Sequence, residues 1–294
     1  ACGSVTSDDG DIFGPVNELT TLLDHAIAAA FAAGRAIMEV YAGPVKVELK
    51  DDRSPLTEAD RQAHEAILHE LAVTRLPVLS EEGKKIPVAE RQGWERYWLV
   101  DPLDGTKEFI KRNGEFTVNI ALMRAIKGEG LVAALGTHTP GASALYVPAK
   151  DILYFAWEGG GAFRVERAAT RGTTATLKLA ALAQRLPLPM PSERPFTIVS
   201  SRSHAGPDTS AFIARMRMKH GDVALTSMGS ALKICLVAEG AADVYPRYAP
   251  TMEWDTAAGQ AIANETGKAL IDVTTDAPMR YNKHTLVNNW FIVQ

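Results

Sequence analysis

The chain has 294 residues, which is enough for one large or two medium domains with a sizeable core. Hydrophobic residues make up 46% and charged residues 22%, so the composition excludes a disordered or fibrous chain. The formal net charge of −4 argues against a nucleic-acid polymer as partner, because such binding requires a basic face. Two cysteines, Cys2 and Cys235, are too few for a disulfide framework and indicate a reducing compartment.

The first part of the chain is predicted to contain a flexible tail and two helices. Residues 1–17 are rich in Gly, Ser and Asp and lack periodicity, which is typical of a tail. Apolar residues then recur at three-and-four spacing from Leu19 to about Tyr41, which predicts an amphipathic helix. Charged residues flank its alanine-rich part, so we expect a soluble helix and no transmembrane segment. A second helix is predicted to begin at Thr57, because Thr57 and Asp60 have capping-box spacing.

Short apolar runs after the second helix predict the strands of a largely antiparallel sheet. In chain order these runs are 77–79, 97–100, 117–125 and 131–136. The last two runs are predicted to pair as a hairpin through the turn at 127–130. A further hairpin is predicted over 152–165, with its turn at three consecutive glycines, 159–161.

A change of composition at 167–195, rich in Thr, Ala and Pro, predicts a boundary between two domains or a crossover connection. Residues 18–166 would form an N-terminal α+β domain, and residues 167–294 a C-terminal α/β domain that completes the site. Strands are predicted at 196–200, 223–227 and 243–245, and helices at 209–219, 230–239 and 255–266. Strands and helices that alternate in this way are typical of α/β structure.

An acidic motif, DPLDGT at 101–106, directly follows an apolar strand and places two aspartates three residues apart. Carboxylates held this close repel each other unless a positive charge lies between them, and aspartate oxygens suit Mg²⁺. The alternative interpretation is that Asp101 and Asp104 are turn and cap residues, which Asp often is beside Pro and Gly. The residues alone leave both interpretations open.

Two further acidic motifs accompany the first. Glu81-Glu82 follows the short apolar run at 77–79, so it too is predicted to lie at a strand end. The run WDTAAG at 254–259 places Asp255 before a helix of small residues, which can approach another element or a ligand closely. Asp255 taken alone is also typical of a helix N-cap.

The three acidic motifs, in this order, resemble the signatures of the inositol monophosphatase superfamily of Mg²⁺-dependent, lithium-sensitive phosphatases. The longer stretches 101–122 and 230–247 are similar to bacterial 3′(2′),5′-bisphosphate nucleotidases of the CysQ type. The resemblance extends from about residue 19 to about residue 267 and fades in the tail and in 167–195. It implies an α/β (α+β) fold, the layered α-β-α-β-α sandwich of the inositol monophosphatase and fructose-1,6-bisphosphatase type.

The resemblance also implies a metal site and a catalytic set. Two or three Mg²⁺ ions would be held by Glu81, Asp101, Asp104, Asp255 and the backbone carbonyl of Leu103. A two-metal clamp can stabilise both the attacking and the leaving oxygen of a phosphoryl displacement. The catalytic residues would be Glu81, Asp60 and Thr106, the last two as the pair that orients the attacking water. For Asp60 the capping-box role is a compatible alternative. Because no Ser, Cys or His nucleophile is paired with a base in these motifs, we expect direct attack by water.

Substrate contacts are predicted in both halves of the chain. The expected substrate-binding residues are Glu81, Leu103, Asp104, Gly105, Thr106, His204, Ser230, Lys233, Arg247 and Asp255. Gly105 and Thr106 can donate backbone N–H groups at a helix start. The resemblance to the nucleotidases implies that His204, Ser230, Lys233 and Arg247 meet the second phosphate, the ribose or the adenine. The alternative for Lys233 is a surface lysine whose stem lies along an apolar helix.

The resemblance to the nucleotidases implies a Mg²⁺-dependent phosphatase that removes the 3′-phosphate from 3′-phosphoadenosine 5′-phosphate to give AMP, which in this family serves sulfate assimilation. The same chemistry would act on 3′-phosphoadenosine 5′-phosphosulfate, and Li⁺ would inhibit it. One alternative is an inositol- or fructose-phosphate phosphatase on the same scaffold, and another is a non-catalytic sensor of metal and nucleotide. We expect a cytoplasmic location. Monomer and homodimer both stay open, as does peripheral association with the inner membrane.

Overall fold

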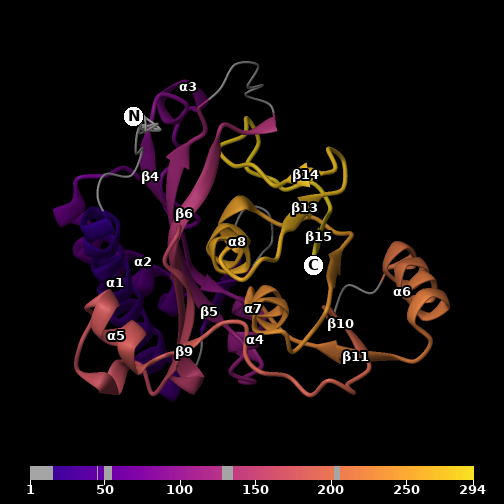
Figure 1. Cartoon of the computed structure of the whole chain (residues 1–294). Coiled ribbons are helices and arrows are strands. Elements are labelled where there is room, and N and C mark those ends of the chain that lie inside the picture. The colour runs from indigo at the N-terminus through magenta and orange to yellow at the C-terminus, as the bar shows by residue number, and fades with distance from the viewer. Residues whose placement is uncertain (1–15, 45, 50–54, 128–134, 202–205) are drawn as a thin grey trace, which may run out of the picture.

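A seven-stranded sheet runs through the N-terminal half of the computed structural model, which describes residues 16–44, 46–49, 55–127, 135–201 and 206–294 (Figure 1). Its strands, in the order in which they pair, are β3 (Val78–Ser80), β4 (Arg96–Asp104), β5 (Thr117–Ala125), β6 (His138–Val147), β7 (Ile152–Trp157), β8 (Gly161–Glu166) and β9 (Gln184–Arg185). Only β3 and β4 run parallel; the other neighbours are antiparallel. The prediction of a largely antiparallel sheet is therefore confirmed.

Helices cover both faces of this sheet (Figure 1). The helices on one face are α1 (Val16–Ala42), α2 (Glu58–Leu71) and α5 (Thr176–Leu182), and those on the other are α7 (Leu232–Glu239) and α8 (Ala257–Asn264). Side chains of a strand alternate between faces, so in β4 Trp98 and Val100 join the core under α1 and α2. Tyr97 and Leu99 join the core under α7 and α8. Burial on both faces explains why the strand reads as one apolar run.

The first predicted helix is α1, and its apolar side packs on α2 and on β6. The stretch Glu18–Ala42 is long and apolar enough to cross a membrane, with a mean hydropathy of 1.2, but 56% of that window is buried inside the protein. Gly34 allows the close approach to β6, because a Cβ atom there would lie 2.4 Å from Cε1 of Tyr146. These contacts are those of a core helix.

Two smaller sheets and an outer helix complete the layers on the C-terminal side. One sheet pairs β10 (Phe196–Ser200) with β11 (Val223–Ser227) in parallel, and the other has the order β12 (Tyr245–Arg247), β15 (Phe291–Val293), β13 (Leu270–Asp272) and β14 (Ala277–Pro278). Helix α6 (Pro207–His220) lies outermost (Figure 1). The succession of layers is therefore α-β-α-β-α, as predicted. Strand β9 falls within 167–195 and pairs with β8, so part of the predicted boundary segment belongs to the first sheet.

Short elements connect the layers. They are β1 (Val47–Leu49), β2 (Pro55–Thr57), η1 (Ala72–Thr74), α3 (Val88–Arg91), α4 (Thr106–Ile110), η3 (Pro148–Lys150), η4 (Ala169–Arg171) and η5 (Glu253–Asp255). Two of them matter for function, because α4 begins inside the DPLDGT motif and η5 contains Asp255.

The predicted hairpin of 117–125 with 131–136 is wrong. Residues 128–134 lie outside the described part of the chain, Leu135 and Gly136 are not in a strand, and β5 pairs instead with β6. The register of this pair shifts between Leu122 and Met123, where β6 contains Pro140 and Gly141. A bulge tolerates a proline that a regular ladder would not, so β6 continues through Pro140 as one strand.

Four predicted elements in the C-terminal half begin at different residues, and the first of them is helix α6, which begins at Pro207 rather than 209. Helix α7 begins at Leu232 rather than 230, and the strand predicted at 243–245 is β12, which begins at Tyr245. The helix predicted at 255–266 is divided into the short η5 and α8. Thr256 is the N-cap of α8, so the N-cap interpretation of Asp255 for that helix is wrong.

Candidate active site

The DPLDGT motif forms the irregular end of β4. Asp101 pairs with Asn119 and Asp104 with Thr117, so β4 holds one extra residue between the two aspartates. A bulge of this kind changes the direction of the side chains that follow it. Asp101 is buried, and its Oδ1 accepts a hydrogen bond from the backbone N of Leu103 at 3.0 Å. The backbone distortion brings both carboxylates to one side of the strand end, next to α4.

Asp60 uses its two oxygens for two different purposes. Its Oδ2 accepts the backbone N–H of Thr57 at 2.7 Å and the Thr57 hydroxyl at 2.6 Å, which is the predicted capping box of α2. Its Oδ1 lies 3.4 Å from the hydroxyl of Thr106, which lies at the same distance from the carbonyl oxygen of Leu103 and can donate to either acceptor. The capping role and the pairing with Thr106 are thus compatible, and the cap fixes the carboxylate that faces Thr106.

Three carboxylates from two distant parts of the chain lie close together near Asp60 and Thr106. Asp101, Asp104 and Asp255 each offer an oxygen, and these atoms all lie within 4.8 Å of one another. Burial is the main reason that the pKa of each is raised, and the neighbouring acidic charges raise it further. For Asp104 the pKa rises to about 6, because the nearby ammonium of Lys233 offsets part of the burial effect. Among the described residues, this acidic cluster could hold a metal ion.

Glu81 approaches the same cluster from β3. Its backbone N donates to the carbonyl of Val100 at 3.1 Å, which continues the parallel pairing of β3 with β4 by one residue. Its charge adds to those that raise the pKa of Asp101 and of Asp104. The two predicted strand ends are therefore neighbours, and their acidic residues interact.

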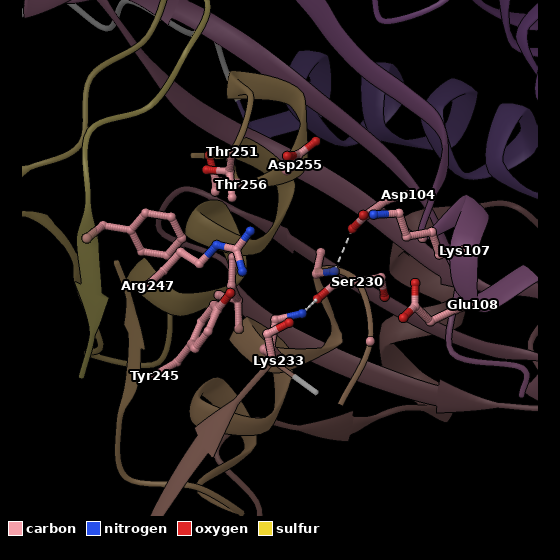
Figure 2. A pocket seen from close by; sticks show the side chains of 16 residues that line it. Asp104, Lys107, Glu108, Ser230, Lys233, Tyr245, Arg247, Thr251, Asp255 and Thr256 are labelled. Carbon is pink, nitrogen blue, oxygen red and sulfur yellow. Dashed lines mark hydrogen bonds between the residues drawn. The ribbon is translucent and has the colours of Figure 1, made fainter. Parts of the chain in front are cut away.

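The opposite wall of the site comes from the C-terminal half (Figure 2). A pocket of about 140 Å³ separates the DPLDGT motif from α7 and β12, and its lining includes Asp104, Gly105, Ser230, Lys233, Tyr245, Arg247 and Asp255. The backbone N of Ala231, the N-cap residue of α7, donates to Oδ2 of Asp104 at 2.6 Å. This hydrogen bond holds the start of α7 next to the acidic carboxylates. Ser230 has a positive φ of 48°, which marks the sharp turn at this point.

Lys233 is a buried residue of this pocket, with 7% of its surface exposed. Its Nζ donates to the carbonyl of Ser230 at 2.6 Å and to that of Met228 at 3.3 Å. The same atom lies 5.5 Å from the ring centroid of Tyr245. Burial lowers the pKa of Lys233 to about 8 despite the charge of Asp104. The alternative that Lys233 is a surface lysine is therefore wrong.

Arg247 adds a second cation to the same wall. It lies on β12, and Figure 2 shows its guanidinium directed into the pocket between Lys233 and Asp255. Its Nη2 donates to the carbonyl of Pro250 at 3.1 Å, whereas its buried Nε has no hydrogen-bond partner among the described residues. A buried N–H without a partner is costly, so this group is suited to an acceptor atom of a ligand.

The structure brings together the predicted site residues that it describes. His204 lies outside the described residues, although Ser201, which stands three residues before it in the chain, lines the pocket. Sequence analysis missed Thr117 and Asn119, whose side chains donate to Oδ2 of Asp104 at 3.4 and 3.3 Å. Both are polar residues at alternate positions of an apolar strand, a signal that could have indicated a polar face at the end of the sheet.

Comparisons with known proteins agree with this geometry. Residues 18–291 match the inositol monophosphatase family. The CysQ 3′(2′),5′-bisphosphate nucleotidases of Salmonella typhimurium and Escherichia coli K12 are each 43% identical over 256 residues, which is 85% of this chain and 90% of theirs. The crystal structure of CysQ from Bacteroides thetaiotaomicron, a bacterial member of the inositol monophosphatase family, is 48% identical with a TM-score of 0.80 and covers 95% of this chain and 98% of its own. An IMPase from Thermotoga maritima shares the fold at 22% identity, with a TM-score of 0.66 over 92% and 91% of the two chains.

Proposed function

Because this chain belongs to the inositol monophosphatase family, we propose that it is a Mg²⁺-dependent 3′(2′),5′-bisphosphate nucleotidase that converts 3′-phosphoadenosine 5′-phosphate to AMP and phosphate. One observation carries this proposal: a single pocket has an acidic cluster on one wall and two cations, Lys233 and Arg247, on the other. A substrate with two phosphate groups can place one at each wall. The names of relatives that are 43% identical support the same activity.

The acidic cluster fits a divalent cation. The family is generally Mg²⁺-dependent. Hard oxygen donors are the ligands that Mg²⁺ prefers, and converging buried carboxylates need a positive charge to coexist in their ionised form. The residues that would hold two or three Mg²⁺ ions are Glu81, Asp101, Leu103 through its carbonyl, Asp104 and Asp255. When bound, Mg²⁺ supplies an activated water and stabilises charge on the phosphate oxygens.

Asp60 and Thr106 orient the attacking water in this proposal. When the Thr106 hydroxyl donates to Asp60 Oδ1, its lone pairs are left to accept a hydrogen bond from a water molecule, and it can take the proton of that water as it passes its own proton to Asp60. Thr57 holds the other oxygen of Asp60 through two hydrogen bonds, so the carboxylate is already oriented toward Thr106. A protein that only binds metal and nucleotide needs no such pair, which favours an enzyme over a sensor.

The second phosphate is proposed to meet Lys233 and Arg247, with Ser230 and His204 near the rest of the nucleotide. Arginine pairs well with phosphate through several N–H groups, and the buried Nε of Arg247 is suited to this role. Gly105 and Thr106 are proposed to donate backbone N–H groups to the phosphate that is removed. We propose a role in sulfate assimilation in the cytoplasm, with 3′-phosphoadenosine 5′-phosphosulfate as a further substrate and Li⁺ as an inhibitor. The division into two domains, peripheral membrane association and the choice of monomer or homodimer stay predictions.

A comparison of substrates tests this proposal. Phosphate release is measured from 3′-phosphoadenosine 5′-phosphate, inositol 1-phosphate and fructose 1,6-bisphosphate, with Mg²⁺ and with added Li⁺. We expect the highest kcat/KM for the nucleotide. In Arg247→Met, kcat/KM for the nucleotide should fall about tenfold or more, since a hydrogen bond to a charged group is lost, whereas that for inositol 1-phosphate should change little. Equal or faster turnover of the inositol ester by the wild type would contradict the nucleotidase assignment.

The acidic cluster also predicts how stability depends on pH. Burial raises the pKa of Asp104 from 3.8 to about 6, so between these pH values the folded protein binds protons that the unfolded chain has released. The free energy of unfolding of the metal-free protein should therefore fall as the pH rises from 3.8 to about 6. Mg²⁺ binds deprotonated carboxylates, so the Mg²⁺-induced increase in Tm should be larger at about pH 8 than at about pH 5. Thermal unfolding with and without Mg²⁺ measures this, and the opposite order would contradict the metal site.

A further inference from the structure

Glu253 is a fully buried acidic residue two positions before Asp255, with none of its surface exposed. Its Oε1 lies 2.7 Å from Nζ of Lys283 and accepts the backbone N–H of Lys283 at 3.0 Å. Its Oε2 accepts the backbone N–H of Asn282 at 2.8 Å. A buried carboxylate is costly unless it is paired and hydrogen-bonded, and here both oxygens have partners.

All of these donors belong to one distant segment, residues 280–288, which wraps the turn that carries Asp255. The backbone N of Glu253 donates to the carbonyl of Leu286 at 2.9 Å, and Met252 forms an isolated bridge with Val287. The side-chain amide of Asn288 donates to the carbonyl of Met252 at 2.7 Å. Through its carboxylate, Glu253 thus joins the turn at 252–255 to the segment 280–288.

Lys283 is the buried cation that pairs with Glu253. With 5% of its surface exposed, its ammonium donates to the carbonyl of Arg280 at 3.0 Å and to Oδ1 of Asn288 at 3.3 Å, in addition to its ion pair with Glu253. The charges of Lys283 and Glu253 compensate each other. The pair therefore adds no net charge near the acidic cluster, and its effect on that cluster is mechanical.

Asp255 depends on this turn for its direction. Its Oδ2 accepts the backbone N–H of Met252 at 2.8 Å, so a shift of the turn shifts the carboxylate with it. The oxygens of Asp101, Asp104 and Asp255 lie within 4.8 Å of one another, and like charges at this distance repel. A turn held only by its own short hydrogen bonds could relieve that repulsion by moving.

We propose that Glu253 and Lys283 are positioning residues that hold Asp255 within the acidic cluster. This inference rests on the proposed metal site and extends it by two residues that do not themselves face the pocket. Groups that orient the ligands of a metal typically change its affinity about tenfold to a hundredfold when they are replaced. The pair should therefore be needed for tight binding of a divalent cation, beyond its contribution to stability.

The test measures binding of Mn²⁺ to the substrate-free full chain by the loss of the electron paramagnetic resonance signal of free Mn²⁺. Glu253→Gln should raise the Mn²⁺ dissociation constant about tenfold or more. It should also raise the Mg²⁺ concentration for half-maximal activity, while kcat at saturating Mg²⁺ stays close to that of the wild type. Loss of stability alone would lower the amount of folded protein and leave the affinity of that protein unchanged.

Glu239→Gln is the matched control, because it makes the same change in another buried glutamate that forms an ion pair. Glu239 Oε1 lies 3.0 Å from Nε of Arg164 and accepts the hydroxyl of Tyr154 at 2.6 Å, at the end of α7 away from the pocket. Its Mn²⁺ affinity should stay within about twofold of the wild type, since distant sites act independently. Lys283→Met provides the same comparison if Glu253→Gln does not accumulate as folded protein.

The outcomes separate this inference from the proposed function. A folded Glu253→Gln or Lys283→Met chain with wild-type Mn²⁺ affinity would overturn the positioning role and leave the nucleotidase proposal standing. A wild-type chain that binds Mn²⁺ but hydrolyses no bisphosphate nucleotide would overturn the proposed function, while a loss of Mn²⁺ affinity in the variant would still support the positioning role. A wild-type chain that binds no Mn²⁺ would overturn the inference as well.

Discussion

Replacing Asp104 with Asn should lower kcat by about a thousandfold, which corresponds to about 4 kcal/mol of transition-state stabilisation. The carboxylate is one of three in the acidic cluster, and it also accepts the backbone N–H of Ala231. An amide carries no charge to offer a divalent cation and presents donors where acceptors are needed. Steady-state phosphate release at several Mg²⁺ concentrations measures the effect, and thermal unfolding shows that the variant is folded.

Asp243→Asn serves as the control for this variant. Asp243 forms an ion pair with Arg194, with 2.7 Å between Oδ1 and Nη2, and it is not among the residues that line the pocket. Its replacement should leave kcat within about twofold of the wild type, because the two sites share no partner. If Asp104→Asn kept the wild-type kcat at every Mg²⁺ concentration, the assignment of the acidic cluster as the metal site would be wrong.

Replacing Thr106 with Val should lower kcat about a hundredfold and leave the Mg²⁺ requirement unchanged. The two side chains have nearly the same shape, but Val lacks the hydroxyl that lies 3.4 Å from Asp60 Oδ1. Proton transfer by a positioned side chain contributes about a hundredfold to ten-thousandfold to catalysis. Turnover and Mg²⁺ titration by the same phosphate-release assay distinguish an effect on chemistry from one on metal binding.

Thr106→Ser is the matched variant for this position, because it keeps the hydroxyl and loses only a methyl group. It should retain activity within about threefold of the wild type, since the group that transfers the proton is preserved. Asp60→Asn should resemble Thr106→Val, because the carboxylate that orients the hydroxyl is neutralised. Wild-type turnover in Thr106→Val would exclude the pair from the reaction and would leave Asp60 with its role in capping α2 alone.

Local patterns in the sequence were sufficient for the features that depend on neighbouring residues. The capping box of Thr57 and Asp60 is confirmed, because it joins atoms within one helical turn. The strand that ends in DPLDGT is also confirmed, since apolar residues on both faces give an unbroken run before the aspartates. The layered fold followed from a resemblance that several ordered motifs carried together.

Features that depend on pairing between distant segments could not be predicted in the same way. The partner of β5 was assigned to the wrong segment, because the next apolar run after a Gly-containing turn is typical of a hairpin, whereas the strand that pairs with β5 is β6, which begins later in the chain. The burial of Lys233 could not be recognised, since an apolar helix with one lysine reads the same whether the lysine faces water or a pocket.

The sequence by itself determined which acidic residues are available, because chemical type and strand-end position are local properties. Only the tertiary structure decided that Asp255 meets Asp101 and Asp104, which lie about 150 residues away in the chain, within 4.8 Å. It also decided that Glu253, which belongs to no acidic motif recognised in the sequence, is buried against Lys283. Such contacts between distant residues depend on how whole layers pack on one another. No single local stretch of the sequence specifies that packing.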